Sequence, residues 1–246
     1  MGEAFAEAAG LPGGDEPAGP ESPNDYAKDE VMNKKLLIIG AGGHGKVVAD
    51  IACDMKVWDE VCFVDDQYPE MNRLGLWEVI GRLEDVCSLR NRFSDVVVAL
   101  GENRLRVKWL KECLDLGFEA PVIRHPSVAV SIMAKIGLGS VLVAKSAVNA
   151  DAVIGLGGIV NTGATIGHDC KLAEGVHVAP GVNLAGASEV GAYSWIGIGS
   201  RVLQKVMIGK DVMVGAGAVV IRDVPDGSTV VGVPGRVIRT ANEPDI

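Results

Sequence analysis

The chain has 246 residues, of which 48% are hydrophobic and only 4% aromatic, and its formal net charge is −9. Eight acidic side chains and one lysine give residues 1–31 a charge of −7, so the other residues together carry only −2. This balance excludes the basic footprint of a nucleic-acid-binding protein, and no apolar run is long enough to cross a bilayer.

Residues 1–31 are predicted to be a disordered acidic tail, because they are rich in Gly and Pro and poor in apolar side chains. The segment is too acidic for a transit peptide and has no apolar signal core. The five cysteines are odd in number and form no Cys-x-x-Cys pair. We therefore expect reduced thiols in a cytoplasmic protein with no membrane partner.

Residues 32–118 alternate between strand and helix patterns. Strands are predicted at Lys34–Gly40, Glu60–Asp66 and Asp95–Gly101, and helices at Lys46–Met55 and Asn103–Leu116. This alternation predicts a small parallel α/β domain of the Rossmann-like type.

A glycine-rich turn separates the first strand from the first helix. Gly40, Gly42 and Gly45 satisfy G-x-G-x-x-G in the strand–turn–helix context that gives the pattern meaning. Glycines there let the backbone approach a phosphate at the helix N-terminus, and the pair Asp65–Asp66 lies where a ribose hydroxyl would be held. Because the domain has the size of one mononucleotide-binding half, a nucleotide fits better than a dinucleotide. A tight turn without ligand is the alternative.

Fifteen consecutive hexapeptides begin with Ile, Leu or Val between Ile136 and Pro225. A period of six fits a solenoid in which three flat faces close a triangular coil. The predicted second domain spans residues 119–239, with five or more coils stacked about 4.8 Å apart, and residues 240–246 form a C-terminal tail. Residues that face each other in adjacent coils are then eighteen positions apart.

Two of the four histidines stand out in this register. His168 has Ala150 in the coil before and Gly186 in the coil after, which predicts a notch beside the imidazole. Asp169 follows directly, and a carboxylate on the far ring nitrogen would fix the tautomer and raise the basicity of the other nitrogen. Since neighbours on a strand point to opposite faces, this contact requires a bend.

His177 lies between Ile159 and Trp195, so its imidazole is expected to contact an indole. For His125, in the junction before the repeats, we expect a structural role.

The ordered motifs resemble one family. They are Gly-Ala-Gly-Gly-His-Gly, Phe-Val-Asp-Asp, Ala-Leu-Gly-Glu-Asn, His-Pro-Ser, Gly-His-Asp-Cys and Gly-Val-Pro-Gly-Arg. Over about residues 34–239 they resemble the bacterial sugar acetyltransferases of the bacillosamine and perosamine pathways, which are related to sialic acid O-acetyltransferases. The resemblance implies a left-handed parallel β-helix, a homotrimer and acetyl-CoA as co-substrate.

The resemblance also implies site residues. His168 would be the general base and Asp169 its orienting acid, although relatives often have Glu at the latter position. The nucleotide-linked amino sugar would be bound by Gly42, Gly43, His44, Asp65, Asp66, Gly101 and Asn161. Acetyl-CoA would be bound by His177, Gly186, Ile198, Ala216 and Arg236.

The resulting hypothesis is acetyl transfer from CoA to the 4-amine of a nucleotide-linked 4-amino-4,6-dideoxy sugar. His168 would remove a proton from the amine, and the Gly186 N–H would stabilise the oxyanion. The basic residues of the last coils, among them Arg236, are candidates for the CoA phosphates or for a solvated face.

Three alternatives stay open. The first is O-acetylation of a sialic-acid-type sugar. The second is a zinc hydratase on the same solenoid, which needs three histidines where the repeats offer two, so no metal is expected. The third is a non-catalytic nucleotide-binding scaffold.

Overall fold

The computed structural model describes residues 34–240. The predicted acidic tail lies outside the described residues, as does nearly all of the predicted C-terminal tail. No helix among residues 34–240 is long and apolar enough to cross a membrane.

The first region is a three-stranded parallel sheet with the order β2-β1-β5. Its main elements are β1 (Lys35–Ile39), α1 (Gly43–Met55), β2 (Glu60–Val64), β5 (Asp95–Val98) and α3 (Asn103–Asp115). Between β2 and β5 lie β3 (Arg73–Leu74), β4 (Trp77–Glu78), a 3₁₀ turn (Leu83–Asp85) and α2 (Val86–Leu89). The predicted α/β order is confirmed, but β2 and β5 end earlier than expected because their last residues turn into the site loops.

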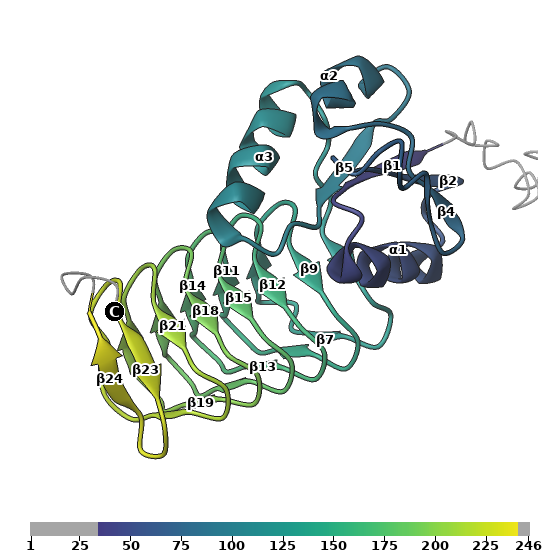
Figure 1. Ribbon diagram of the computed structural model, residues 1–246. Helices are drawn as coiled ribbons and strands as arrows, with labels where there is room; N and C mark the ends of the chain where they lie inside the picture. The colour runs from purple at the N-terminus through teal and green to yellow at the C-terminus, as the bar shows by residue number, and fades with distance from the viewer. Residues whose placement is uncertain (1–33, 241–246) are drawn as a thin grey trace, which may run out of the picture. The chain divides into compact units, whose positions relative to one another are not determined.

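The second region is a parallel β-helix with three walls (Figure 1). The first wall contains β6 (Ile123–Arg124), β9 (Val141–Leu142), β12 (Ile159–Val160), β15 (His177–Val178), β18 (Trp195–Ile196), β21 (Met213–Val214), β23 (Thr229–Val231) and β24 (Arg236–Arg239). The second wall contains β7 (Ala129–Val130), β10 (Ala147–Val148), β13 (Thr165–Ile166), β16 (Asn183–Leu184), β19 (Arg201–Val202) and β22 (Val219–Val220). The third wall contains β8 (Lys135–Ile136), β11 (Val153–Ile154), β14 (Lys171–Leu172), β17 (Glu189–Val190) and β20 (Met207–Ile208).

The aliphatic position of each hexapeptide points into the coil. Val148, Val160 and Ile166, for example, are at most 2% exposed and belong to one continuous apolar core. The eighteen-residue register is confirmed, since Ile159 pairs with His177 and His177 pairs with Trp195. Burial of the aliphatic residue of each hexapeptide in this shared core therefore sets the six-residue period.

The β-helix starts earlier than the repeat series indicates. β6 and β7 already lie in the six-residue spacing, before the first hexapeptide of that series at Ile136 and within the predicted second domain. Arg124 takes the aliphatic position in β6, but it is exposed because no coil lies beneath it. The end of the solenoid therefore tolerates a polar residue that hides the repeat.

Helix α3 lies along the edge where the third wall turns into the first (Figure 1). Leu110 is close to Gly139 and Val107 to Gly175, and a Cβ on either glycine would clash with these side chains. The helix pitch of about 5.4 Å nearly matches the coil spacing of about 4.8 Å, so successive helical turns meet successive coils. Glycine at these corners lets the helix pack directly on the backbone.

Helix α1 covers the start of the first wall. The outward side chains of Ile123, Val141 and Ile159 are buried and share a core with α1 residues such as Ile51. The next outward residue in this column is His177, followed by Trp195. The part of the first wall that α1 covers thus ends where the outward-facing side chains change from aliphatic to aromatic.

Candidate active site

The glycine-rich turn begins the helix earlier than the sequence suggests. Helix α1 starts at Gly43, so His44 lies in its first turn and not in a loop. Gly45 packs so close to Gly40 that a Cβ there would clash with the Gly40 carbonyl oxygen. A Cβ on Gly42 or Gly43, in contrast, would meet no atom within 4 Å. One face of the turn is therefore sealed and the other is open beside the helix N-terminus.

Of the acidic pair after β2, Asp65 stabilises this turn and Asp66 contacts the 3₁₀ turn. Asp65 Oδ2 accepts a hydrogen bond from the Ala41 N–H at 2.8 Å, and its Oδ1 accepts one from the Gln67 N–H at 3.0 Å. Asp66 Oδ1 lies 3.4 Å from the Leu83 N–H. The expected contacts of both carboxylates with substrate stay predictions. Gly101 follows β5 and has open space on its Cβ side.

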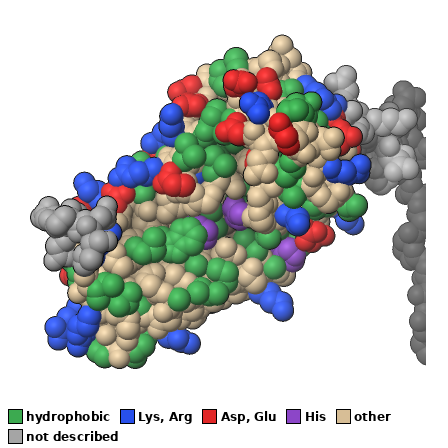
Figure 2. Space-filling view, viewed as in Figure 1, with side chains coloured by type: hydrophobic (Ala, Val, Ile, Leu, Met, Phe, Trp, Pro, Cys, Tyr) green, Lys and Arg blue, Asp and Glu red, His purple; other side chains and the backbone are tan. Residues whose placement is uncertain are grey.

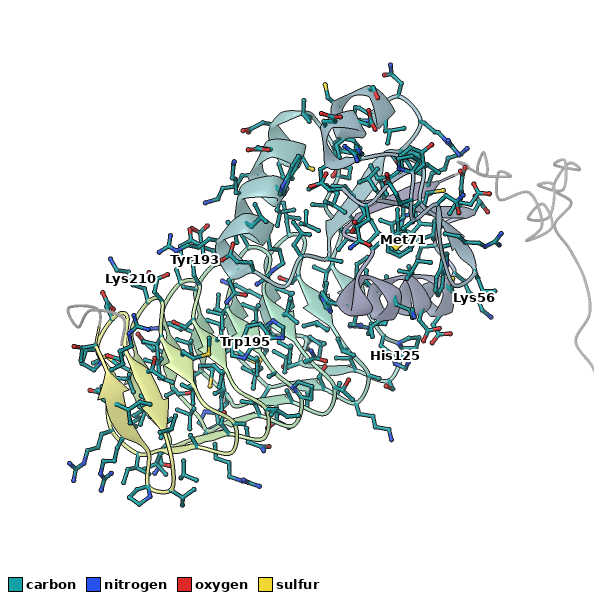
Figure 3. All side chains as sticks on the ribbon, viewed as in Figure 1. Lys56, Met71, His125, Tyr193, Trp195 and Lys210 are labelled. Atoms are coloured by element: carbon teal, nitrogen blue, oxygen red, sulfur yellow. The ribbon has the colours of Figure 1, made fainter. Side chains whose placement is uncertain are left out.

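An aromatic column lies beneath the helix N-terminus. The rings of His177 and Trp195 are 3.9 Å apart between centroids, and those of His44 and His177 are 6.4 Å apart. Histidine side chains lie in the notch between the α/β region and the β-helix in Figure 2, and Figure 3 places Trp195 on the open part of the first wall. The contact expected between His177 and the indole is confirmed.

Beside this column is a hollow of about 400 Å³. It is lined by Gly101, Glu102, Asn103, Arg104, Tyr193, Trp195, Asp211, Val212 and Met213. The hollow joins Gly101, in the loop after β5, to Trp195 on the first wall.

Both buried imidazoles are neutral at physiological pH. Burial, together with the charge of Arg106, lowers the pKa of His44 to about 4. Burial and the same guanidinium, with a contribution from His44, lower the pKa of His177 to about 3. Each ring therefore offers one N–H donor and one acceptor nitrogen.

Arg106 is the main residue that the sequence reasoning missed. It is 1% exposed and donates to the carbonyl oxygens of Gly157 (2.9 Å) and Gly175 (2.8 Å), and to Leu100 and Asn103. Burial lowers its pKa to about 10, so it stays charged. From sequence, an arginine in a helix is expected to be exposed. Arg106 is buried because α3 packs on the corner glycines, and this packing cannot be inferred from the helix alone.

Asn103 and Arg104 also connect α3 to the β-helix. Its amide donates to the Tyr193 carbonyl at 2.8 Å, and Arg104 forms a two-point ion pair with Asp211. Tyr193, marked in Figure 3, also carries the Arg104 guanidinium 4.4 Å above its ring. These contacts hold α3, and with it the α/β region, against the β-helix.

His168 and Asp169 lie at the corner where the second wall turns into the third. His168 Nδ1 is 2.6 Å from Asp169 Oδ2, and the side chains are 69% and 59% exposed. Asp169 has a φ of +59°, a left-handed conformation that Asp tolerates better than most residues. This corner supplies the bend that the contact requires, and the carboxylate directs the other ring nitrogen, Nε2, away from itself.

The expected notch beside His168 is present. A Cβ on Gly186 would lie 2.6 Å from His168 Cε1, so only glycine leaves room for the imidazole in this position. Within residues 34–240, the Gly186 N–H donates no hydrogen bond. The free ring nitrogen and a free backbone donor are thus adjacent.

The predicted acetyl-CoA residues do not gather in one chain. His177 is on the first wall, and Gly186 is at the corner after the second. Ile198 (57% exposed) and Ala216 lie at the corner after the first wall, and Arg236 is in the terminal strand β24. Asn161 is beside His177, 3.5 Å from its Nε2.

His125 lies outside this region, and its contacts are local. His125 Nδ1 accepts from the Ser127 N–H at 3.0 Å and its Nε2 is 3.4 Å from Asp54, contacts that suit the expected structural role. Across the described part of the chain, no group of three or more His, Cys, Asp or Glu side chains is placed to hold a metal.

A parallel β-helix with this six-residue repeat is typical of one class of acyltransferases, and an exposed histidine oriented by a carboxylate is the kind of base that acyl transfer uses. The family models agree with this class. Residues 35–113 match the PglD N-terminal domain, and residues 187–222 match the bacterial transferase hexapeptide, six repeats.

Solved structures identify the family within this class of acyltransferases. The chain is 43% identical to the acetyltransferase domain of PglB from Neisseria gonorrhoeae, solved with acetyl coenzyme A, with a TM-score of 0.81 over 84% of this chain and 100% of that one. It is 39% identical to PerB from Caulobacter crescentus, solved with CoA and GDP-perosamine, with a TM-score of 0.78 over 82% and 96% of the two chains. The chain therefore belongs to the bacillosamine/perosamine family of hexapeptide-repeat acetyltransferases.

Curated sequences match over shorter stretches. UDP-N-acetylbacillosamine N-acetyltransferase of Bacillus subtilis is 37% identical over 114 residues, which are 45% of this chain and 52% of that protein. A serine acetyltransferase of Synechococcus elongatus is 58% identical over 43 residues, 18% of each chain. The chain thus matches about half or less of the length of these curated relatives.

Proposed function

We propose that the protein is an acetyl-CoA-dependent N-acetyltransferase that acts on the 4-amino group of a nucleotide-linked 4-amino-4,6-dideoxy sugar. The observation that carries the proposal is the pairing of His168 with Asp169 beside Gly186 on the β-helix. Two observations support a nucleotide-linked acceptor: the open side of the glycine turn, and the GDP-perosamine bound in the structure of PerB.

In this mechanism His168 Nε2 is the general base. Asp169 accepts a hydrogen bond from the Nδ1–H, which leaves the lone pair on Nε2 free to take a proton from the sugar amine. The amine nitrogen attacks the thioester carbonyl as its proton moves to Nε2, and the CoA thiolate leaves when the C–S bond breaks. The Gly186 N–H donates to the oxygen of the tetrahedral intermediate.

The geometry further supports a site shared between chains. His168 is at the corner between the second and third walls, whereas His44 and His177 lie against the first wall, on the opposite side of the triangular coil. A substrate held at the glycine turn of one chain therefore cannot meet His168 of the same chain around that corner. We propose a homotrimer in which each active site combines the glycine turn of one chain with His168 of its neighbour.

The direct test is CoA-thiol release with acetyl-CoA and a panel of acceptors. UDP-, GDP- and dTDP-linked 4-amino sugars are compared with sialic acids. Turnover with an amino-sugar nucleotide, and a fall of about 10²–10⁴-fold in kcat for His168→Ala, is expected. Turnover of sialic acids alone, or near-normal kcat in that variant, would exclude the proposal.

A further inference from the structure

Two buried side chains donate to one carbonyl oxygen beside the corner that carries His168. Ser188 Oγ donates to the Ala185 carbonyl oxygen at 2.9 Å, and Cys170 Sγ donates to the same oxygen at 3.2 Å. Both side chains are fully buried, and Sγ and Oγ are 3.3 Å apart. Since a thiol and a hydroxyl each carry one hydrogen, both hydrogens are directed at this single acceptor.

The two donors are confined to the two coils that form the notch. Cys170 and Ser188 occupy the same inward-facing position of successive coils. At this position the other coils have side chains without a donor, namely Ala134, Ala152, Val206 and Val224. The solenoid therefore folds without polar groups in this column, and packing of its core does not account for the two donors at this level.

A buried serine at another corner has a different arrangement. Ser140 Oγ donates to the Gly155 carbonyl oxygen and accepts from the Gly158 N–H, both at 3.2 Å, so it connects one coil to the next. In the described part of the chain, Ser188 Oγ accepts from no backbone N–H, and the carbonyl of Ala185 lies in its own coil. The Ser188 hydroxyl therefore acts on this one peptide and not on the stacking of the coils.

The Ala185 carbonyl belongs to the same peptide unit as the Gly186 N–H. This peptide is trans, so its C=O and N–H point in opposite directions. Because the carbonyl oxygen faces the buried donors, the N–H points away from the coil interior, and within residues 34–240 it donates to no acceptor. The buried pair thus holds the peptide in the orientation that presents this N–H next to His168.

We propose that Cys170 and Ser188 are positioning residues for the oxyanion of the transfer reaction. Their hydrogen bonds fix the plane of the peptide and polarise it, and a hydrogen bond at one end of a peptide strengthens the bond made at the other end. The Gly186 N–H is then a stronger donor to the oxygen that gains charge when the amine attacks the thioester. The proposal rests on the proposed function and refines its oxyanion site. Both side chains act through the peptide, because their burial keeps them from substrate and CoA.

The test compares kcat and KM in the full chain for Cys170→Ala, Ser188→Ala and the double variant. Alanine already occupies this column at Ala134 and Ala152, so the coils accommodate it. Loss of an oxyanion donor lowers kcat by about 10²–10³-fold, and a weakened donor loses part of that. For the double variant we expect kcat to fall about tenfold while KM for acetyl-CoA changes less than about twofold, as for an interaction made only in the transition state.

Conservative variants separate this role from a structural one. Cys170→Ser and Ser188→Thr keep a donor, and threonine has the size of Val206 one coil further on, so both should keep most of the wild-type kcat. Ser140→Ala is the matched control, since it removes a buried hydroxyl from a carbonyl at a different corner. It should lower the melting temperature at least as much as Ser188→Ala does and leave kcat unchanged.

The amide signal of Gly186 tests the polarisation without acetyl transfer. With isotope-labelled glycine, this signal is identified by its absence in Gly186→Ala. Its proton resonance should move upfield in the double variant, because the carbonyl has lost its donors, and should not move in Ser140→Ala.

Three results would each overturn the proposal. They are an unmoved Gly186 signal in the double variant, a kcat of that variant within about twofold of the wild type, and an equal loss of kcat in Ser140→Ala. If the wild type transfers acetyl to no amino-sugar nucleotide, the proposed function fails, and the Gly186 signal still decides whether the buried pair polarises this peptide.

Discussion

Gly186→Ala tests the notch beside His168. A Cβ at position 186 would lie 2.6 Å from His168 Cε1, about 1 Å inside ordinary van der Waals contact, so the imidazole must shift by about that distance. The ring is exposed and free to swing outward, which breaks its alignment and leaves the coil intact. A misplacement of about 1 Å costs on the order of 10²-fold in rate. We therefore expect kcat to fall about 100-fold, with a change in melting temperature of less than about 2 °C.

The assay is CoA release at saturating substrates, with circular dichroism for the melting temperature. Gln204→Ala is the control, because Gln204 occupies the same column one coil further on and is exposed. Its kcat should match that of the wild type. A Gly186→Ala enzyme with at least half of the wild-type kcat would refute the claim that the notch positions the base.

Two further predictions concern the buried groups. Arg106→Leu leaves three buried acceptors and one half-buried acceptor without a donor, so the free energy of unfolding should fall by about 3 kcal/mol or more in urea titrations. A loss below about 1 kcal/mol would contradict the claim that Arg106 holds α3 on the β-helix. The pKa of His177 is lowered to about 3 in the folded chain, so between about pH 3 and 6.5 the unfolded chain binds a proton at His177 that the folded chain does not. Protonation of His177 therefore favours unfolding below about pH 6.5 and has no such effect above it. As the pH falls from 6.5 towards 4, wild type should lose about 1.4 kcal/mol per pH unit more than His177→Phe. Equal slopes would show that the histidine titrates normally.

The repeat register was the most predictable part of the fold. The spacing of the aliphatic residues gave the column that joins Ile159, His177 and Trp195, and the structure confirms it. The aliphatic series does not mark the first coil because an end coil is not packed on both sides, and Arg124 is stable there in place of an aliphatic residue.

The site was predictable only in part, for physical reasons. The His168–Asp169 contact depends on a left-handed residue at the corner, which the residue type permits but does not require. The pairing of His44 with His177 joins residues 133 positions apart, and it depends on how α1 lies on the first wall. Nothing in a single sequence fixes that packing, and the role of Arg106 depends on it as well.

Subunit complementation tests the shared active site most directly. Chains with His168→Ala and chains with His44→Phe are each expected to be nearly inactive, and they are mixed in equal amounts, unfolded and refolded together. If each site takes His168 from one chain and His44 from its neighbour, random trimers should recover about a quarter of the wild-type activity. If mixing restores no activity while wild-type chains treated in the same way regain theirs, both residues act within one chain, which would contradict the account.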